Sequence, residues 1–255
     1  MAPGVTVGQV SKRLKAFLDW TATQPKSSTF LSVMLNGGTA FNNIYQQAVM
    51  EKALMDKFRW FAGSGMLSSQ LIFGHFIHTD DHILQQVLKH DIAMTWNPFS
   101  NGRMASGVPD IPKYLKMGIR VGMGIDGEAS GDLADPFENM RVGLYAIRDK
   151  YGDATVLTPY QVMWFHTMGS ADVLKVKDRL GSLEPGKLAD FLLSDPTRLG
   201  AVLEDPYANL VLVTGKHDID DVYVGGELKV YHGQLLHQDM QAVEAEVMRR
   251  VTAVQ

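Results

Sequence analysis

The sequence predicts an α/β fold of the β/α-barrel type, and three observations support this prediction. Three short apolar runs each end in a polar cluster, and a helical pattern follows each run: LIFGH (71–75), IAMTWNPFSN (92–101) and RVGMGIDGEAS (120–130). Strand, polar tip and helix recur in the order of a β/α barrel. Chemistry in such barrels lies at the C-terminal tips of the strands, and the tips here carry His75, Asn97 and Asp126.

The composition is that of an ordinary globular protein. The 255 residues are 45% hydrophobic and 20% charged, and the net charge of −4 provides no basic surface for nucleic acid. No apolar run reaches the length of a membrane span, and the lack of cysteine excludes disulfides, thiolate zinc sites and a cysteine nucleophile. We therefore expect a cytoplasmic protein with no nucleic-acid or membrane partner.

The first part of the chain is predicted to form one strand between two helices. Apolar residues at helical spacing predict an amphipathic helix over residues 5–22, and residues 43–62 give a second helical pattern. Between them, TFLSVML (29–35) is typical of a buried strand, and Asn-Gly-Gly at 36–38 closes it.

The next three strands alternate with helices that carry recognisable start signals. Thr79 is the predicted N-cap of a helix after the first of these strands, and a short helix is expected over residues 109–117. DPFE at 135–138 is a capping-box pattern with proline at the first helical position, so it predicts a helix from 136 to about 150. A further helix is expected over 159–168.

A change in composition divides the chain into a partial β/α barrel over residues 1–178 and a small β module over 179–255. GSLEPGKLADFLLSD (181–195) contains a Pro-Gly turn that leads into a half-buried strand. VYVGGELKVYHGQL (222–235) has the pattern of a hairpin around its glycine pair. Residues 238–251 are predicted to form a terminal helix.

Two strand tips carry residue types that perform acid–base chemistry. His75 ends an apolar strand, where a histidine can bind a metal, transfer a proton or simply cap the strand. Asp126 lies between glycines at another tip. A carboxylate there can bind a metal or act as general base, although Asp-Gly is also a common turn pair.

The other candidates are polar residues near these tips. The side chains of NPFSN (97–101) could bind a substrate or form an Asx turn, and those of the following loop could line a pocket or stay in solvent. His166 lies beside Trp164 and Phe165, which favours a core histidine over a ligand. The candidate substrate-binding residues are Asn97, Ser100, Asn101, Glu128 and Ser130.

The order of these segments resembles the metal-dependent amidohydrolase superfamily. The resemblance rests on GHFIHTDDHILQQVLKHDIAMTWNPFSN, GIRVGMGIDGEASGDLADPFENMR, GSLEPGKLADFLLSD and IDDVYVGGELKVYHGQL, in that order. It covers about residues 45–237 and is strongest to the branch that holds cytosine and guanine deaminases, adenosylhomocysteine-type deaminases and triazine hydrolases.

The resemblance implies a (β/α)8 TIM barrel, of which this chain would hold about strands 5–8, with a small C-terminal β-sandwich remnant. It places His75, Asn97 and Asp126 at the ends of strands six, seven and eight. In the family a divalent metal, usually zinc or iron, activates a water molecule. Asp126 would bind the metal and take the proton, and His75 would polarise a purine, pyrimidine or triazine. The implied reaction is hydrolysis of a non-peptide C–N bond or a related displacement, such as dechlorination, at a ring carbon.

Two parts of the family's metal site have no counterpart in this sequence. The family carries a His-x-His pair on strand one and a histidine at the end of strand five, whereas no histidine precedes His75 here. We therefore expect no retained metal and little activity from this chain alone. It is either the C-terminal half of an amidohydrolase completed from elsewhere, or an inactive remnant or binding protein. Strands five and eight would leave open sheet edges, from which we expect self-association.

Overall fold

A computed structural model describes residues 31–35, 58–59, 62–131, 134–195 and 204–254. The helix expected over 5–22, most of that expected over 43–62 and the Asn-Gly-Gly turn lie outside these ranges. The first part contains β1 (Leu31–Leu35), β2 (Leu71–His75), α4 (Asp81–Lys89), β3 (Ala93–Trp96), α5 (Pro98–Arg103), α6 (Ile111–Met117), β4 (Val121–Met123), α7 (Glu128–Gly131), α8 (Pro136–Tyr151), α9 (Pro159–Trp164), the π-helix η1 (Phe165–Gly169) and α10 (Ser170–Val173). The second part contains β5 (Phe191–Ser194), α11 (Pro206–Ala208), the π-helix η3 (Asn209–Val213), the 3-10 helix η4 (Lys216–Asp218), β6 (Ile219–Val224), β7 (Glu227–Tyr231), β8 (Gln234–Leu235) and α12 (Met240–Val254).

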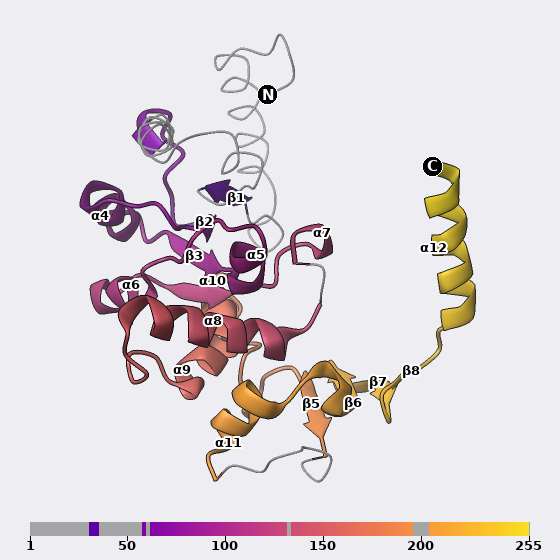
Figure 1. Ribbon diagram of the computed structural model, residues 1–255. Coiled ribbons are helices and arrows are strands. Elements are labelled where there is room, and N and C mark those ends of the chain that lie inside the picture. The colour runs from indigo at the N-terminus through magenta and orange to yellow at the C-terminus, as the bar shows by residue number, and fades with distance from the viewer. Residues whose placement is uncertain (1–30, 36–57, 60–61, 132–133, 196–203, 255) are drawn as a thin grey trace.

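The first sheet is parallel and has the strand order β1-β2-β3-β4 (Figure 1). Strands that follow one another in the chain are therefore neighbours in the sheet, as in a β/α barrel. Leu35 pairs with His75 in β2, and Trp96 of β3 pairs with Met123 of β4, so the tips of the four strands point to one edge. Every residue of β2 is buried, as expected of a parallel strand that is covered on both faces.

The outer edge of β4 is occupied by a side chain. Gly124 donates its N–H to Trp96 on the β3 side, so the N–H and C=O of the preceding residue, Met123, face outward. The Ser170 hydroxyl accepts the Met123 N–H at 3.1 Å, and its single proton faces two carbonyl oxygens, that of Met123 at 3.0 Å and that of Phe165 at 2.9 Å. At this residue the expected open edge is not found, because Ser170 of α10 accepts the outward N–H of Met123.

The helices begin mostly where the sequence predicts, because the capping side chains are present. Asp135 accepts hydrogen bonds from the N–H groups of Phe137 and Glu138, and α8 follows over Pro136–Tyr151. Thr79 is not the cap of α4: Asp80 accepts the Ile83 N–H at 2.8 Å instead. The hydroxyl of Thr79 is used elsewhere, in a hydrogen bond to the Tyr114 hydroxyl in α6.

The second sheet is antiparallel, with the order β5-β6-β7-β8. Its β6–β7 turn is made by Gly225 and Gly226, both with positive φ, which confirms the predicted hairpin. The segment α11–η3, which precedes β6 in the chain, packs against α8 and α9 of the first part, and its Val211 is fully buried in the main core. The division of the chain near residue 179 remains a prediction. Residues after this point, in η3, contribute to the core formed by residues before it.

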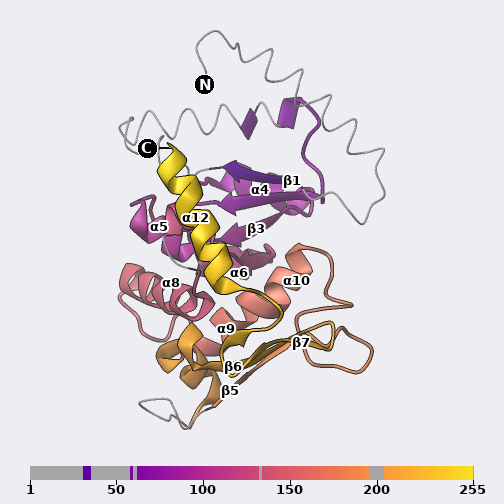
Figure 2. The same ribbon diagram turned by 90° about the vertical axis from the view of Figure 1, so that its right-hand side faces the viewer.

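The terminal helix α12 stands away from both sheets (Figures 1 and 2). Its apolar residues Met240, Val243 and Val247 are about half exposed. In the described part of the chain, no helix has the length and apolar character needed to cross a membrane.

Candidate functional site

His75 ends β2 in a tight turn. The Phe76 N–H donates to the Gly74 carbonyl at 2.8 Å, so His75 is the central residue of a three-residue turn, and its φ is 65°. A positive φ is uncommon for a residue with a side chain, and such strain is concentrated at functional sites. The turn directs the imidazole inward, where its side chain is only 1% exposed.

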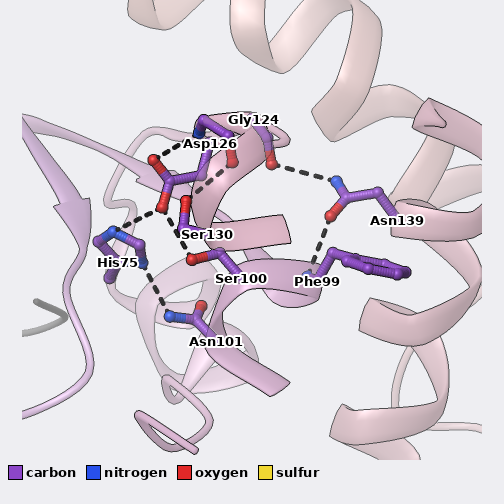
Figure 3. Close-up of polar contacts among 9 residues, drawn as sticks. His75, Phe99, Ser100, Asn101, Gly124, Asp126, Ser130 and Asn139 are labelled. Carbon is purple, nitrogen blue, oxygen red and sulfur yellow. Dashed lines mark hydrogen bonds and ion pairs between the residues drawn. The ribbon is translucent and has the colours of Figure 1, made fainter. Parts of the chain in front are cut away.

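Asp126 follows β4 in a second left-handed turn, with a φ of 64°. Its Oδ1 accepts the N–H of Gly127 at 2.8 Å, which fixes the carboxylate against its own backbone. Its Oδ2 lies 3.5 Å from His75 Nε2 (Figure 3). The tips of β2 and β4 therefore meet at one point, although β3 lies between the two strands in the sheet.

Helix α5, which follows β3, supplies the residues that link the pair. The Ser100 hydroxyl donates to Asp126 Oδ2 at 2.8 Å, and the Asn101 amide nitrogen lies 2.8 Å from His75 Nδ1 (Figure 3). Both side chains are buried. Proline at the first helical position of α5 starts the helix directly at the strand tip, so these consecutive residues reach the two neighbouring tips.

Burial and hydrogen bonding set the charges of the pair. Burial lowers the pKa of His75 below its ordinary value of 6.5, although the negative charge of Asp126 opposes this effect. Burial raises the pKa of Asp126, but hydrogen bonds from Ser100 and Gly127 outweigh it and bring the pKa below its ordinary 3.8. Near neutral pH the site therefore holds a neutral imidazole beside an ionised carboxylate.

The other predicted residues lie around this centre. Asn97 is buried, and a Cβ added at Gly124 would come within 2.6 Å of its Oδ1, so it packs against the backbone before Asp126. The Ser130 hydroxyl donates to the Gly127 carbonyl at 2.9 Å and so stabilises the turn. Glu128 begins α7, and a role in binding substrate remains a prediction for it and for the others.

Asn139 of α8 is a site residue that sequence reasoning missed. Its amide donates to the Gly124 carbonyl and its Oδ1 accepts the Phe99 N–H, both at 3.1 Å, so it joins the β3 and β4 tips (Figure 3). It is 1% exposed and lies one turn from Gly143 on the buried side of α8. The available signal in the sequence was a polar residue one turn before a glycine within a helix. The capping pattern at the start of α8 predicts where the helix begins but not which of its faces is buried.

The donor set does not fit the divalent metal that the resemblance implies. A catalytic zinc takes three protein ligands, yet no three His, Cys, Asp or Glu side chains converge among the described residues. Both Asp126 oxygens already accept hydrogen bonds, and the sequence has neither a cysteine nor a histidine before His75. The described residues therefore form a polar pair with supporting groups and not a metal centre.

Solved hydrolases share this arrangement of elements. The chain is similar to an adenosine deaminase from Xanthomonas campestris with bound zinc, with a TM-score of 0.77, 22% identity and coverage of 94% of this chain and 52% of that one. It is also similar to the zinc complex of atrazine chlorohydrolase from Arthrobacter aurescens TC1, with a TM-score of 0.71, 20% identity and coverage of 96% and 60%. The fold is therefore of the TIM-barrel type.

The sequence itself identifies the family. Residues 36–229 match the amidohydrolase family, and the chain belongs to it. A 5-methylthioadenosine/S-adenosylhomocysteine deaminase of Bacillus thuringiensis (strain Al Hakam) is 30% identical over 190 residues, which are 74% of this chain and 43% of that protein. The chain thus spans less than half the length of this curated relative.

Proposed function

We propose that this chain carries the proton-handling half of a hydrolase site that cleaves a C–N bond of a small heterocyclic molecule, such as the amino group of a purine. The observation that carries the proposal is the pair His75 Nε2 and Asp126 Oδ2, 3.5 Å apart and held from behind by Ser100 and Asn101. The similarity to deaminases that act on adenosine compounds supports the substrate class.

The two residues have complementary roles in this proposal. Asp126 is ionised at neutral pH and 18% exposed, so it can accept a proton from the attacking water and pass it to the leaving nitrogen. His75 is neutral and can donate a hydrogen bond to a ring nitrogen of the substrate, which makes the adjacent carbon more electrophilic. In the family a bound divalent metal would supply activation of the water, but the described residues of this chain bring together no set of three ligands for one.

Turnover therefore depends on groups outside this sequence, and we expect little or none from this polypeptide by itself. The same missing donor set favours a second candidate, a protein that binds a heterocycle without cleaving it. The two candidates differ in one respect: completing the barrel restores activity only if the His75–Asp126 pair is competent.

Co-expression tests this difference. The chain is produced alone and together with the part of the B. thuringiensis deaminase that lies outside the match, and ammonia release from 5′-methylthioadenosine and adenosine is measured with added zinc or iron. The hydrolase proposal is supported if the co-expressed sample releases ammonia and Asp126→Asn abolishes this release. The control variant is Asp153→Asn, which changes a carboxylate in an exposed turn.

Binding of the same nucleosides to the chain alone is measured by calorimetry. Saturable binding with no ammonia release in either sample favours the binding protein, and absence of both binding and release contradicts both candidates. Stoichiometric zinc and turnover in the unpaired chain would contradict the requirement for a second part.

A further inference from the structure

The imidazole of His75 is held by different groups at its two nitrogens. Nδ1 lies 2.8 Å from the Asn101 amide nitrogen, and Nε2 lies 3.5 Å from Asp126 Oδ2. His75 Nε2 and Asn101 Oδ1 are both buried and have no hydrogen-bond partner among the described residues. The orientation of one amide therefore bears directly on which ring nitrogen carries the proton.

Asn101 is rigidly placed. Its N–H donates to the Asn97 carbonyl and its own carbonyl accepts the Ser106 N–H, both at 2.9 Å, so its backbone is fixed on both sides. Its side chain is 3% exposed, which leaves little room for another rotamer. The amide nitrogen that faces His75 is a donor only, so a hydrogen bond there requires a lone pair on Nδ1.

We infer that Asn101 is a positioning residue that fixes His75 in the tautomer with its proton on Nε2, facing Asp126. In a neutral ring, a lone pair on Nδ1 leaves the proton on Nε2. The reversed amide would place Oδ1 against Nδ1, require the proton there and turn the bare Nε2 lone pair toward a carboxylate. That alternative is disfavoured by repulsion, so Asp126 and Asn101 select the same arrangement.

This inference rests on the proposed function for its meaning, because a neutral histidine can polarise a substrate through Nε2 only if that nitrogen has the proton. The unpaired Asn101 Oδ1 is the cost of the arrangement. Buried acceptors without partners are rare in folded proteins, and each requires an explanation. Here the explanation is that the amide cannot satisfy its oxygen without reversing the tautomer of His75.

The test is nitrogen NMR of the imidazole rings in the full chain, with no substrate, above the pH at which the rings protonate. The His75 signals are assigned by their loss in His75→Gln. In the wild-type chain, Nε2 should have the shift of a protonated nitrogen and Nδ1 that of a bare one, with a preference of about tenfold or more. The reverse pattern in the wild-type chain would overturn the inference, whatever the variants do.

Three variants separate Asn101 from Asp126. Asn101→Asp should reverse the pattern or protonate both nitrogens, and Asn101→Leu should bring the two shifts toward each other. Asp126→Asn should keep the wild-type pattern. An unchanged pattern in Asn101→Asp, or a pattern lost in Asp126→Asn but kept in Asn101→Leu, would show that Asn101 does not set the tautomer. The ring of His166, in η1, is the internal control and should not change.

The proposed function can fail separately from this inference. The expected tautomer in a chain that neither binds nucleosides nor supports ammonia release would leave the inference standing without the hydrolase role. Active paired chains with the opposite tautomer would overturn the inference alone.

Discussion

Gly169 is the position where adding one methyl group should do the most damage to the sheet. It lies in η1 directly behind β4, and a Cβ built there would come within 2.5 Å of the Val121 carbonyl oxygen and 3.0 Å of the Trp164 ring. A relaxed carbon–oxygen contact is about 3.3 Å, so helix and strand must separate by most of an ångström. The obstacle is backbone, which cannot rotate away as a side chain could.

The expected cost of Gly169→Ala follows from two opposing effects. Overpacking of this kind costs about 1–3 kcal/mol, and a backbone clash belongs at the upper end of that range. Alanine's better helix propensity offsets at most about 1 kcal/mol. The net loss in the free energy of unfolding is therefore about 2 kcal/mol, which lowers the Tm by roughly 4–8 °C in a chain of this size.

The matched control is Gly102→Ala in α5. Nothing lies within 4 Å of a Cβ built at Gly102, and its φ is not positive. This variant should be about 0.4–1 kcal/mol more stable than the wild type. Urea unfolding followed by tryptophan fluorescence measures both, since Trp96 is buried in the core. The packing argument is refuted if Gly169→Ala is as stable as the wild type, or if both variants lose the same stability.

Three further results are expected. The free energy of unfolding should fall as the pH drops below about 6.5, because burial lowers the pKa values of His75 and His166, so that the unfolded chain binds protons that the folded chain does not. Urea unfolding at several pH values measures this, and stability should depend less steeply on pH in His166→Gln. Asp135→Ala should lower the free energy of unfolding by about 1–3 kcal/mol and Thr158→Ala by about 1 kcal/mol, because Thr158 caps only α9 whereas Asp135 caps α8 and also accepts the Lys216 N–H at 3.1 Å. Equal losses by chemical denaturation would argue against a contribution from the contact with Lys216. Burial and the hydrogen bond to Asp110 raise the pKa of Tyr151 to about 12, so spectrophotometric titration should show it ionising there, and Asp110→Asn should return it toward 10; no change in that variant would contradict the assignment.

The parallel sheet and its helices could be predicted from the sequence because their signals are local. Apolar runs of four or five residues, a cap with proline after it and a glycine pair in a hairpin each act within a few residues, and the structure confirms β1–β4, α8 and the β6–β7 turn. The cap of α4 is Asp80, one residue after the predicted Thr79. Threonine and aspartate both cap helices well, and only the contact of Thr79 with Tyr114, 35 residues away, separates them.

The site could be predicted only as a set of candidates. His75 and Asp126 can be recognised because they follow apolar strands. The 3.5 Å between His75 Nε2 and Asp126 Oδ2, however, depends on two left-handed turns that the sequence pattern does not predict. The hydrogen bonds of Ser100 and Asn101 depend on where α5 starts relative to both tips. Asn139 reaches the site, and Ser170 reaches the outer edge of β4, from helices more than 10 residues beyond Asp126, and both roles arise from tertiary packing alone.

The serine at the outer edge of β4 bears on how this chain behaves at high concentration. An exposed strand edge invites a strand from another molecule to hydrogen-bond with it, which is how sheets grow into aggregates. At Met123 an incoming strand would find the backbone N–H already bonded to Ser170, and η1 and α10, which pack against β4, would obstruct its approach. We expect Ser170→Ala to leave the Met123 N–H without this partner and so to make the β4 edge more open to a strand from another copy of the chain.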